Sequence, residues 1–309
     1  MPGVTAPTPM PLLHLGLDAG GTQTRWALAD ATGALQAEGS APPITGLMLL
    51  DAPGRAALAE ALQALVAALP AGTVLRSAWA GVTGFDAALA AVIGAALGLP
   101  TAAVRVCSDI ELACRAAFAP GEGLVVYAGT GSIAALLSAD GSLHRAGGRG
   151  AVIDDAGGGH WIARQALQIV WRAEDAAPGA GAATPLGRAL AQAVGGGDWP
   201  ATRAFVYGAS RGELGTLALA VAVAADAGDA PALALLQQAG RELARLAQAL
   251  HGRLGAGLPV ALAGRVFELH PAIETALRQA LPGVTVHRST EPAQRAAARL
   301  AAALENHRR

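Results

Sequence analysis

The chain contains no lysine, and all 22 of its basic residues are arginines. The sequence therefore excludes a Walker P-loop, the strand lysine of protein kinases and the Schiff-base lysine of pyridoxal enzymes. A phosphate site in this chain must depend on other donors, such as backbone N–H groups and hydroxyls.

Cysteine and charge are also scarce. The two cysteines, Cys107 and Cys114, are too few for a disulfide framework, and we expect both to be buried thiols in a reducing cytoplasm. Charged residues make up 15% of the 309 residues and the formal net charge is -1, so no overall field favours nucleic acid or an anionic membrane. The sequence also lacks a basic stripe with interleaved aromatics, and we expect no nucleic-acid partner.

No targeting or membrane-spanning segment is expected. Residues 1–11 are rich in proline and lack the pattern of a signal peptide, which predicts a disordered start. The longest apolar stretch, Leu214 to Ala225, is too short to span a bilayer. We therefore expect a soluble, cytoplasmic protein, and its 53% of hydrophobic residues is ample for a sizeable core.

Two short glycine-rich turns are the most informative features that the chain does contain. One is Asp18-Ala19-Gly20-Gly21-Thr22-Gln23-Thr24-Arg25, which follows a mostly apolar run at 12–17. The other is Gly129-Thr130-Gly131-Ser132, which follows the apolar run at 124–127. Such turns expose backbone N–H groups that can face phosphate oxygens. Their positions in separate halves of the chain predict two walls of a single nucleotide cleft.

Hydrophobic patterning predicts an α/β protein whose halves repeat one order of elements. In the first half we expect strands at 12–18, 24–29, 34–39, 75–80 and 104–108, and helices at 52–69, 85–97 and 110–118. In the second half we expect strands at 123–127, 133–137, 143–146, 260–262 and 284–287, and helices at 159–171, 185–194, 200–207, 214–227, 230–253 and 291–304, with a short helix after residue 265. The shared order indicates duplication, with a boundary near 117–121.

Asp18 ends an apolar strand, where a carboxylate is costly to bury without a cation or hydrogen-bond donors. One interpretation is an outer-shell Mg²⁺ ligand beside a phosphate loop, and the other is a turn-capping aspartate. The residues that follow favour the first, because glycines let a phosphate approach the backbone closely and Thr22 and Thr24 add hydroxyls. Since the turn joins two strands, it is a hairpin loop and not the strand-to-helix turn of a Rossmann fold.

Asp109 also follows a strand, and it opens a helix. It could be an N-cap aspartate, or a general base that accepts the proton of a substrate hydroxyl attacking the γ-phosphate. Its place between the two glycine turns, about twenty residues before the second, favours the general base.

Three further segments in the second half carry candidate residues. Gly129 to Ser132 is either a plain hairpin turn or a turn that holds the β/γ end of a nucleotide. Residues 147–150 and 153–159 form either a surface loop or a sugar-binding segment, in which Asp155 accepts hydrogen bonds from hydroxyls. Residues 261–264 form a strand that ends in a glycine turn, where adenosine binding is a weaker hypothesis.

These motifs, taken in order, resemble those of the BadF/BadG/BcrA/BcrD ATPase family. The order is Asp-x-Gly-Gly-Thr-x-Thr-Arg, then Ser-Asp, then Ala-Gly-Thr-Gly-Ser, then Gly-Gly-x-Gly with a following Asp. The resemblance covers about residues 13–304 and is closest to N-acetylglucosamine kinases and bacterial glucosamine kinases of the actin/hexokinase/heat-shock-chaperone superfamily. It implies two actin-like (ribonuclease H-like) domains around a central cleft, at 12–118 and 119–309, with helix 291–304 packing back on the first.

The resemblance also implies roles for individual residues. ATP and Mg²⁺ would be bound in the first domain by Asp18, which also holds the metal, and by Gly20, Gly21, Thr22, Thr24 and Arg25. In the second domain, Gly129, Thr130, Gly131, Ser132 and Gly264 would bind the nucleotide. Asp109 would be the base on the sugar 6-hydroxyl. The sugar would contact Gly148, Arg149, Asp155 and Thr45, the last of which lies near the position of a sugar-binding Asn in the family.

This chain departs from the family pattern at several positions. It reads Asp154-Asp155-Ala156 where Gly-Asp-Glu is usual, Arg149 where N-acetylglucosamine kinases have Trp, and Ala263 before Gly264 where Gly-Gly is usual. The Gly-Gly-Arg sequence at 147–149 looks like that of glucosamine kinases. These departures concern the identity of the sugar more than the kinase chemistry.

Three functions remain open from the sequence. The leading one is an ATP-dependent amino-sugar 6-kinase acting on glucosamine or N-acetylglucosamine, with a small-molecule partner, no membrane partner and room for a homodimer. A second is an iron–sulfur activator ATPase, although Cys107 and Cys114 are close together and Cys107 lies in a buried strand. A third is a non-catalytic, sugar-sensing protein, although we expect no DNA-binding helix-turn-helix before Leu12.

Overall fold

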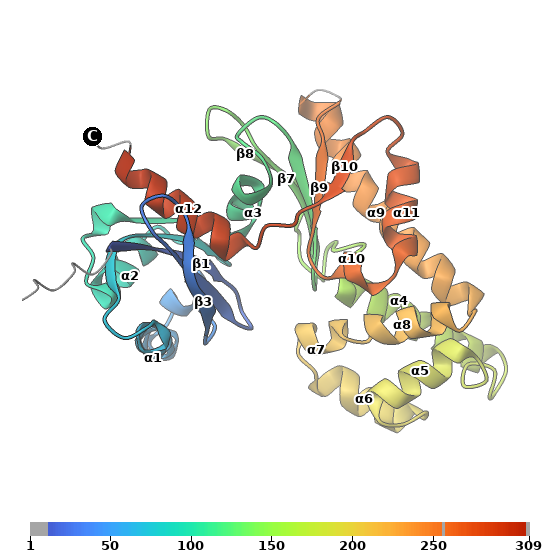
Figure 1. Cartoon of the computed structure of the whole chain (residues 1–309). Coiled ribbons are helices and arrows are strands. Elements are labelled where there is room, and N and C mark those ends of the chain that lie inside the picture. Colours follow the sequence, from blue (N-terminus) through green and yellow to red (C-terminus); the bar gives the residue numbers. More distant parts are fainter. Residues whose placement is uncertain (1–11, 255–256, 307–309) are drawn as a thin grey trace, which may run out of the picture. The chain divides into compact units, whose positions relative to one another are not determined.

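The computed structural model describes residues 12–254 and 257–306. The disordered start predicted for residues 1–11 lies outside the described residues. The chain divides into two compact units, of which the first is Met1–Ala117 with Thr290–Arg309 and the second is Phe118–Ser289. Each unit contains a five-stranded mixed sheet and several helices (Figure 1). The mixed α/β organisation predicted from the sequence is thus confirmed.

The sheet of the first unit has the strand order β3-β2-β1-β4-β5. Its strands are β1 (Leu12–Ala19), β2 (Thr24–Ala29), β3 (Leu35–Ala41), β4 (Val74–Val82) and β5 (Val104–Ser108). The central strand β1 pairs antiparallel with β2 and parallel with β4. It is buried over most of its length, as its apolar run predicts. The central position of β1 brings its carboxyl end, and the turn that follows, to the middle of one sheet edge.

Helix α1 (Ala52–Ala68) follows β3 and a short 3-10 turn, η1 (Gly46–Leu49). It begins where Asp51 accepts a hydrogen bond from Gly54 N at 2.7 Å. Its buried leucines belong to the core of the first unit, and its bounds agree to within one residue with the helix predicted at 52–69.

Helix α2 (Leu89–Leu97) is shorter than the predicted helix at 85–97. Gly84 adopts a φ of +68°, and Asp86 then accepts a hydrogen bond from Ala88 N at 2.8 Å. This turn occupies the residues that we expected to form the first helical turn. The 3-10 turn η2 (Thr101–Ala103), β5 and helix α3 (Asp109–Ala117) complete the repeat.

The last helix, α12 (Ala293–Asn306), packs on β1, β2 and β4 of the first unit (Figure 1). Gly16 in β1 is required for this contact, because a Cβ there would lie 2.1 Å from Ala298 N and 2.2 Å from Gln294 O. The sequence analysis placed residues 119–309 in the second domain, with helix 291–304 packing back on the first, and the structure groups Thr290–Arg309 with the first unit. The close approach of a helix to a glycine in the central strand is the physical reason.

The sheet of the second unit repeats the arrangement of the first. Its strands are β6 (Leu124–Ala128), β7 (Ser132–Leu137), β8 (Leu143–Gly147), β9 (Val260–Ala263) and β10 (Val286–Arg288), in the order β10-β9-β6-β7-β8. The central strand β6 pairs antiparallel with β7 and parallel with β9. Taken from the β8 edge, this order matches that of the first sheet, as the predicted duplication requires.

The helices of the second unit are more numerous than those of the first. Between β8 and β9 lie α4 (Gly159–Ala176), α5 (Pro185–Val194), α6 (Trp199–Gly208), α7 (Arg211–Gly215), α8 (Ala218–Asp226) and α9 (Ala230–Leu254). Between β9 and β10 lie α10 (Val266–Leu269) and α11 (Pro271–Ala280). Figure 1 shows α5, α6 and α7 away from the strands, and α9 and α11 side by side.

Two of the predicted helices are each split into two in the structure. The helix expected at 214–227 is split into α7 and α8, because Thr216 Oγ1 and Thr216 N both bond to Glu213 O and end the first turn. The single short helix expected after residue 265 is split into α10 and α11. There the ring of His270 accepts a hydrogen bond from Ala272 N at 3.1 Å and caps the second helix.

Each unit has its own hydrophobic core. The first gathers leucines and isoleucines of β1, β2, α1 and α2, and the second is built on β6, α4, α8 and α9. Burying one such side chain contributes roughly 1.5–3 kcal/mol, so both sheets are firm supports for the turns at their edges. Cys107 and Cys114 are buried thiols, as predicted. Among the described residues, every helix is too short or too polar to cross a bilayer.

Candidate functional site

The turn between β1 and β2 presents an open stretch of backbone. Gly20 N donates to Gln23 O at 3.2 Å, which closes the turn. Gly21 and Thr22 are exposed, and a Cβ placed on Gly21 would meet no atom within 4 Å. This backbone is therefore accessible to a phosphate group. Thr24, by contrast, is fully buried, and its hydroxyl has no hydrogen-bond partner within the described part of the chain.

The carboxyl group of Asp18 is partly buried next to this turn. Burial raises its pKa, the neighbouring Arg25 opposes that rise, and the charge of Asp109 adds to it. Arg25 is the residue that pairs with Asp18 across the β1–β2 ladder. Within residues 12–254 and 257–306, this carboxylate receives no hydrogen bond. A carboxylate with so little compensation is a ready ligand for a cation.

These donors fit a Mg²⁺ ion that is held largely by phosphate and water. Mg²⁺ commonly takes one or two protein carboxylates and leaves its other positions to water and substrate phosphates. Asp18 supplies one such carboxylate beside an accessible turn. The described residues contain no group of three or more His, Cys, Asp or Glu side chains that could enclose a metal. The role of Asp18 as metal ligand stays a prediction, and the chemistry of its surroundings suits it.

Asp109 lies at the start of α3 with both carboxylate oxygens engaged. Oδ1 accepts from Ile110 N at 2.8 Å, and Oδ2 accepts from Thr83 Oγ1 at 2.7 Å. The cap of this helix is another residue, because Ser108 Oγ accepts from Glu111 N at 3.2 Å. Asp109 therefore does not act as the N-cap. The hydroxyl of Thr83 fixes the orientation of its carboxylate, which sequence reasoning did not foresee.

The Thr83–Gly84 segment also contacts the segment that contains Thr45. Gly46 N donates to Thr83 O at 3.0 Å, and a Cβ on Gly46 would lie 1.8 Å from Gly84 O. Thr83 N in turn donates to Ala19 O at 2.9 Å. Thr83 thus connects the end of β1, Asp109 and the residue after Thr45. The only signal for Thr83 in the sequence is a hydroxyl residue directly after the strand β4.

The turn between β6 and β7 is more enclosed than the first. Gly129 N donates to Gly131 O at 2.9 Å, and the carbonyls of Gly129 and Thr130 accept from Gly159 N and His160 N at the start of α4. Ser132 Oγ donates to Ala156 O at 2.7 Å. These hydrogen bonds hold the turn against the start of α4.

Asp155 lies directly over this turn, at hydrogen-bond distance from an arginine. Its side chain is 4% exposed, and its Oδ2 is 3.0 Å from Arg211 Nη2, whose side chain is 48% exposed. A Cβ on Gly131 would lie 2.6 Å from Asp155 Oδ2 and 2.8 Å from Arg211 Nη2. The structure thus brings the predicted sugar residue Asp155 to the predicted phosphate residue Gly131. Arg211 was not foreseen, because it lies 56 residues away along the chain.

A small cavity of about 50 Å³ adjoins Asp155. Its lining residues come from the loop before α4 and from the first turns of that helix: Ala151, Ile153, Asp154, Asp155, His160, Trp161 and Arg164. Burial lowers the pKa of His160, the charges of Arg211 and Arg164 lower it further, and Asp155 opposes them. His160 is therefore neutral at pH 7.

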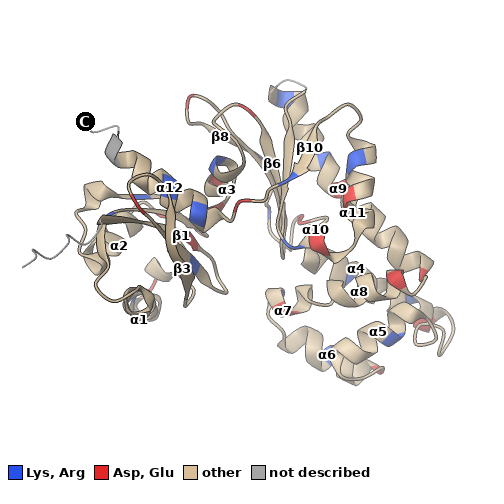
Figure 2. Cartoon of the chain, viewed as in Figure 1, with Lys and Arg blue, Asp and Glu red and all other residues tan. Residues whose placement is uncertain are grey.

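The loop that precedes this cavity contains the other two predicted sugar residues. Gly148 has a φ of +65°, its N–H donates to Ser132 O at 2.9 Å, and a Cβ on it would lie 2.7 Å from Ile133 Cδ1. Arg149 is exposed. Charged residues are sparse in both units (Figure 2).

Gly264, the predicted adenosine residue, lies against the end of β6. Its φ is +97°, and a Cβ there would lie 2.3 Å from Ala128 O, so glycine is required. Because Ala128 directly precedes Gly129, the structure brings Gly264 next to the second glycine turn.

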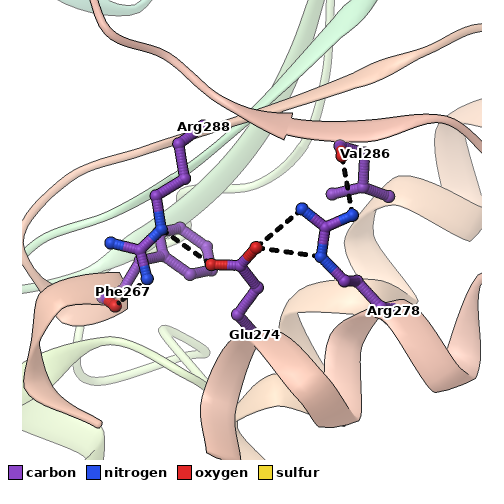
Figure 3. A network of polar contacts seen from close by, with 5 residues as sticks. All are labelled: Phe267, Glu274, Arg278, Val286 and Arg288. Carbon is purple, nitrogen blue, oxygen red and sulfur yellow. Dashed lines mark hydrogen bonds and ion pairs between the residues drawn. The ribbon is translucent and has the colours of Figure 1, made fainter. Parts of the chain in front are cut away.

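A polar network holds the segment that follows Gly264 (Figure 3). Glu274 accepts from Arg278 Nη2 at 2.6 Å and from Arg288 Nε at 2.7 Å. The two arginines also donate to backbone carbonyls, Arg278 Nη1 to Val286 O at 2.7 Å and Arg288 Nη2 to Phe267 O at 2.6 Å. The network joins α10, α11 and β10, and it therefore fixes the backbone on the carboxyl side of Gly264.

The predicted residues thus form two clusters, one in each unit. In the first unit, Asp18, Asp109 and the Gly20–Thr22 backbone lie together, and Thr83 connects them to the Thr45 segment. In the second unit, the Gly129–Ser132 turn lies with Gly148, Asp155 and Gly264. Sequence reasoning did not identify Thr83, Arg211, His160 or Arg164.

Comparison with known proteins identifies the family and the fold. The sequence profile of the BadF/BadG/BcrA/BcrD ATPase family matches residues 15–299. A crystal structure from Chromobacterium violaceum named "Putative N-acetylglucosamine Kinase" is 30% identical and has a TM-score of 0.72, with 95% of this chain and 100% of that chain covered.

Two further structures are similar in fold. A protein from Porphyromonas gingivalis with the same name is 17% identical at a TM-score of 0.69, with 96% of this chain and 99% of that one covered. A ROK family glucokinase from Streptomyces griseus, crystallised with glucose and AMPPNP, is 17% identical at a TM-score of 0.61, with 94% and 98% covered. The fold is therefore that of two-domain actin-like ATPases. Since the family profile matches nearly the whole chain, this protein belongs to the BadF/BadG/BcrA/BcrD ATPase family.

Proposed function

We propose that this protein is an ATP-dependent kinase that phosphorylates the 6-hydroxyl of an amino sugar, glucosamine or N-acetylglucosamine. The observation that carries the proposal is the cluster of Asp18, Asp109 and the accessible Gly20–Thr22 backbone in the first unit. It combines a cation ligand, an oriented carboxylate and phosphate-facing N–H groups, which are the parts that phosphoryl transfer needs. The 30% identical relative named for N-acetylglucosamine supports the substrate class.

Asp109 is the proposed general base. Thr83 Oγ1 and Ile110 N hold its carboxylate in one orientation. The base accepts the proton of the sugar 6-hydroxyl as that oxygen forms a bond to the γ-phosphorus. The bond between the γ-phosphorus and the bridging oxygen breaks, and ADP leaves with the electron pair. General-base catalysis of this kind contributes about 10²- to 10⁴-fold.

The two glycine turns are the proposed phosphate-binding loops. Gly21 and Thr22 are proposed to offer backbone donors in one unit, and Thr130 and Gly131 in the other, with Gly264 next to the second turn for adenosine. The N–H groups of Gly20 and Gly129 already donate to Gln23 O and Gly131 O, so these two glycines are proposed to shape the turns that face the phosphates. Mg²⁺, held by Asp18, would neutralise phosphate charge in a chain without lysine. Asp155, with Gly148, Arg149 and Thr45, is proposed to bind the sugar.

The iron–sulfur alternative has no comparable support. Cluster-binding cysteines need an accessible thiolate, whereas Cys107 and Cys114 are both buried. Burial raises the pKa of Cys107 to about 12. The sugar-sensing alternative is less well supported, because a protein that only binds sugar does not need an oriented carboxylate such as that of Asp109.

The test is a coupled ADP-release assay with glucosamine, N-acetylglucosamine, N-acetylmuramic acid and glucose. We expect sugar-dependent ADP release by the wild type, and loss of turnover in Asp109→Asn with ATP binding retained by calorimetry. Glu60→Gln, which removes an exposed carboxylate on α1, is the matched control and should keep full activity. Normal turnover in Asp109→Asn would refute the general base, and no sugar-dependent release by the wild type would refute the kinase.

A further inference from the structure

The ion pair between Asp155 and Arg211 combines a buried carboxylate with a half-exposed guanidinium. The Asp155 side chain is 4% exposed and that of Arg211 is 48% exposed, at a distance of 3.0 Å between Oδ2 and Nη2. Only Oδ2 of the carboxylate has a hydrogen-bonding partner within residues 12–254 and 257–306. Oδ1 is therefore left for another donor, and Asp155 lines the cavity beside it.

The helix that contains Arg211 is fixed at both ends. Ser210 and Glu213 form a capping box, in which Ser210 N donates to Glu213 Oε2 at 2.8 Å and Glu213 N donates to Ser210 Oγ at 3.3 Å. At the other end, a Cβ on Gly215 would lie 3.4 Å from His160 N and 3.6 Å from Thr130 Cγ2. Helix α7 is therefore anchored on the second glycine turn and on the start of α4. This anchoring holds the Arg211 guanidinium next to the Asp155 carboxylate.

The ion pair also fills the space over Gly131. A Cβ there would lie 2.6 Å from Asp155 Oδ2 and 2.8 Å from Arg211 Nη2. The ion pair therefore leaves no room for a side chain at position 131.

The remaining charges around the cavity add no free negative charge next to Asp155. Asp154, the other acidic residue of the lining, is 3.0 Å from Arg245 Nη2, and Arg245 is also paired with Glu242. Arg164, a third charged residue of the lining, is exposed and has no ion-pair partner among the described residues. Burial is the main cause of the lowered pKa of His160, and the positive charges of Arg211 and Arg164 add to it.

We propose that Arg211 is a positioning and specificity-determining residue that holds the Asp155 carboxylate for the sugar and cancels its charge, so that the site favours a sugar with an uncharged 2-substituent over a 2-ammonium sugar. This inference rests on the proposed sugar-kinase function. A carboxylate whose charge is balanced still accepts hydrogen bonds from sugar hydroxyls, but it attracts an ammonium group weakly. Arg211 acts through Asp155, and the nucleotide should not depend on it.

The experiment compares Arg211→Gln and Arg211→Lys with wild type in steady-state assays on N-acetylglucosamine and glucosamine. In Arg211→Gln we expect the KM for N-acetylglucosamine to rise about 10- to 100-fold, because a buried carboxylate loses its partner. The KM for ATP should stay within about threefold. The ratio of kcat/KM for glucosamine to that for N-acetylglucosamine should rise about tenfold or more, because the freed charge attracts the ammonium group.

Two variants separate positioning from a general structural effect. Arg211→Lys keeps the charge and should restore the wild-type sugar ratio to within about threefold. Arg172→Gln removes an exposed arginine of α4 away from the cavity lining and should leave every constant unchanged.

If Arg211→Gln fails to fold, the double variant Asp155→Asn/Arg211→Gln replaces it. Its sugar KM should equal that of Asp155→Asn alone, because Arg211 acts only through that carboxylate.

Each outcome decides between the two proposals. An unchanged sugar ratio in Arg211→Gln, a rise in the KM for ATP instead of the sugar KM, or additive effects in the double variant would overturn the inference while the kinase stands. Turnover of none of the sugars by the wild type would overturn the proposed function, and this inference with it.

Discussion

The two sheets share one topology and differ in what lies at their edges. Counted from β3 and from β8, both run through two antiparallel pairs into two parallel ones, with a glycine turn after the central strand. The first turn is accessible and lies beside two carboxylates, Asp18 and Asp109. The second is covered by an ion pair, Asp155–Arg211, and by the start of α4. The same sheet topology thus has an accessible glycine turn in one unit and a covered one in the other.

Carboxylates at these two strand ends, Asp18 and Asp109, occur in the first unit, and the equivalent positions of the second unit have none. Asp18 pairs with Arg25 across β1 and β2, whereas the residue one position before the last in β6 is Tyr127, opposite Ile133. Asp109 follows β5, and the residue that follows β10 is Ser289. Under the proposed function, metal binding and proton removal would lie in one half and sugar binding in the other.

The difference arises from one connection. A single helix, α1, and a short 3-10 turn link β3 to β4, whereas α4 to α9 link β8 to β9. The longer connection supplies Asp155, His160 and Arg164 from the loop before α4 and its first turns, and Arg211 from α7. The cavity in the second unit is thus lined by the β8–β9 connection, its loop and the start of α4, and not by the strands.

The largest expected effect concerns the carboxylate beside the first turn. Asp18→Asn should lower kcat/KM for ATP by about 10²- to 10³-fold, because an amide binds Mg²⁺ far more weakly than a carboxylate. Asp140→Asn, the same change in an exposed hairpin of the second sheet, should leave the rate within about twofold. Equal losses in the two variants, in the coupled ADP-release assay, would contradict the asymmetry.

The second prediction concerns the helix that covers the first sheet. Gly16→Val should lower the free energy of unfolding by about 3 kcal/mol or more, because its side chain would overlap the backbone of α12 at Ala298 and Gln294. Gly141→Ala in the β7–β8 turn, where space is open and φ is +86°, should cost only about 1 kcal/mol. The measurement is urea unfolding by circular dichroism, and equal costs would refute the tight α12 contact.

The third prediction compares the two turns directly. Gly131→Ala should lower stability by roughly 1–3 kcal/mol, because its Cβ would collide with Asp155 and Arg211. Gly21→Ala should leave the melting temperature nearly unchanged, since no atom lies within 4 Å of its Cβ, and should weaken ATP binding instead. Thermal unfolding with and without ATP measures both. A larger loss of stability in Gly21→Ala would reverse the comparison.

The smallest expected effect concerns the network behind Gly264. The pKa of Glu274 is lowered from its ordinary value of 4.5, since Arg288 and Arg278 outweigh its burial. Its folded pKa is below the unfolded one, so its pairing stabilises the fold above about pH 4.5 and the contribution is lost as pH falls through the folded value. Glu274→Gln should cost about 1–2 kcal/mol at pH 7 and less at pH 3. Urea unfolding at both pH values measures this, and an equal cost at the two would contradict it.

Local signals in the sequence predicted most of the fold. The bounds of β2, β5 and α5 agree residue for residue with the predicted ranges, because alternation, glycine turns and helix-starting prolines are encoded within a few residues. The duplication was visible for the same reason. The split between α7 and α8 was missed, since the bonds of Thr216 to Glu213 end a run that is otherwise apolar.

The candidate site was predicted less completely than the fold. Asp18 and Asp109 stand at strand ends, which a strand-and-turn pattern locates. Thr83 and Arg211 act through partners 26 and 56 residues away, and no local pattern connects them. Thr24 was expected as an added hydroxyl donor to phosphate, but its strand turns it inward, where it is fully buried.

The most direct test of the two-turn account is a crystal structure of the protein with a non-hydrolysable ATP analogue and Mg²⁺. The account predicts phosphate oxygens within hydrogen-bond distance of backbone N–H groups in both Gly20–Thr22 and Gly129–Gly131, with the metal on the Asp18 side. A nucleotide whose phosphates contact one turn and leave the other in solvent would contradict it.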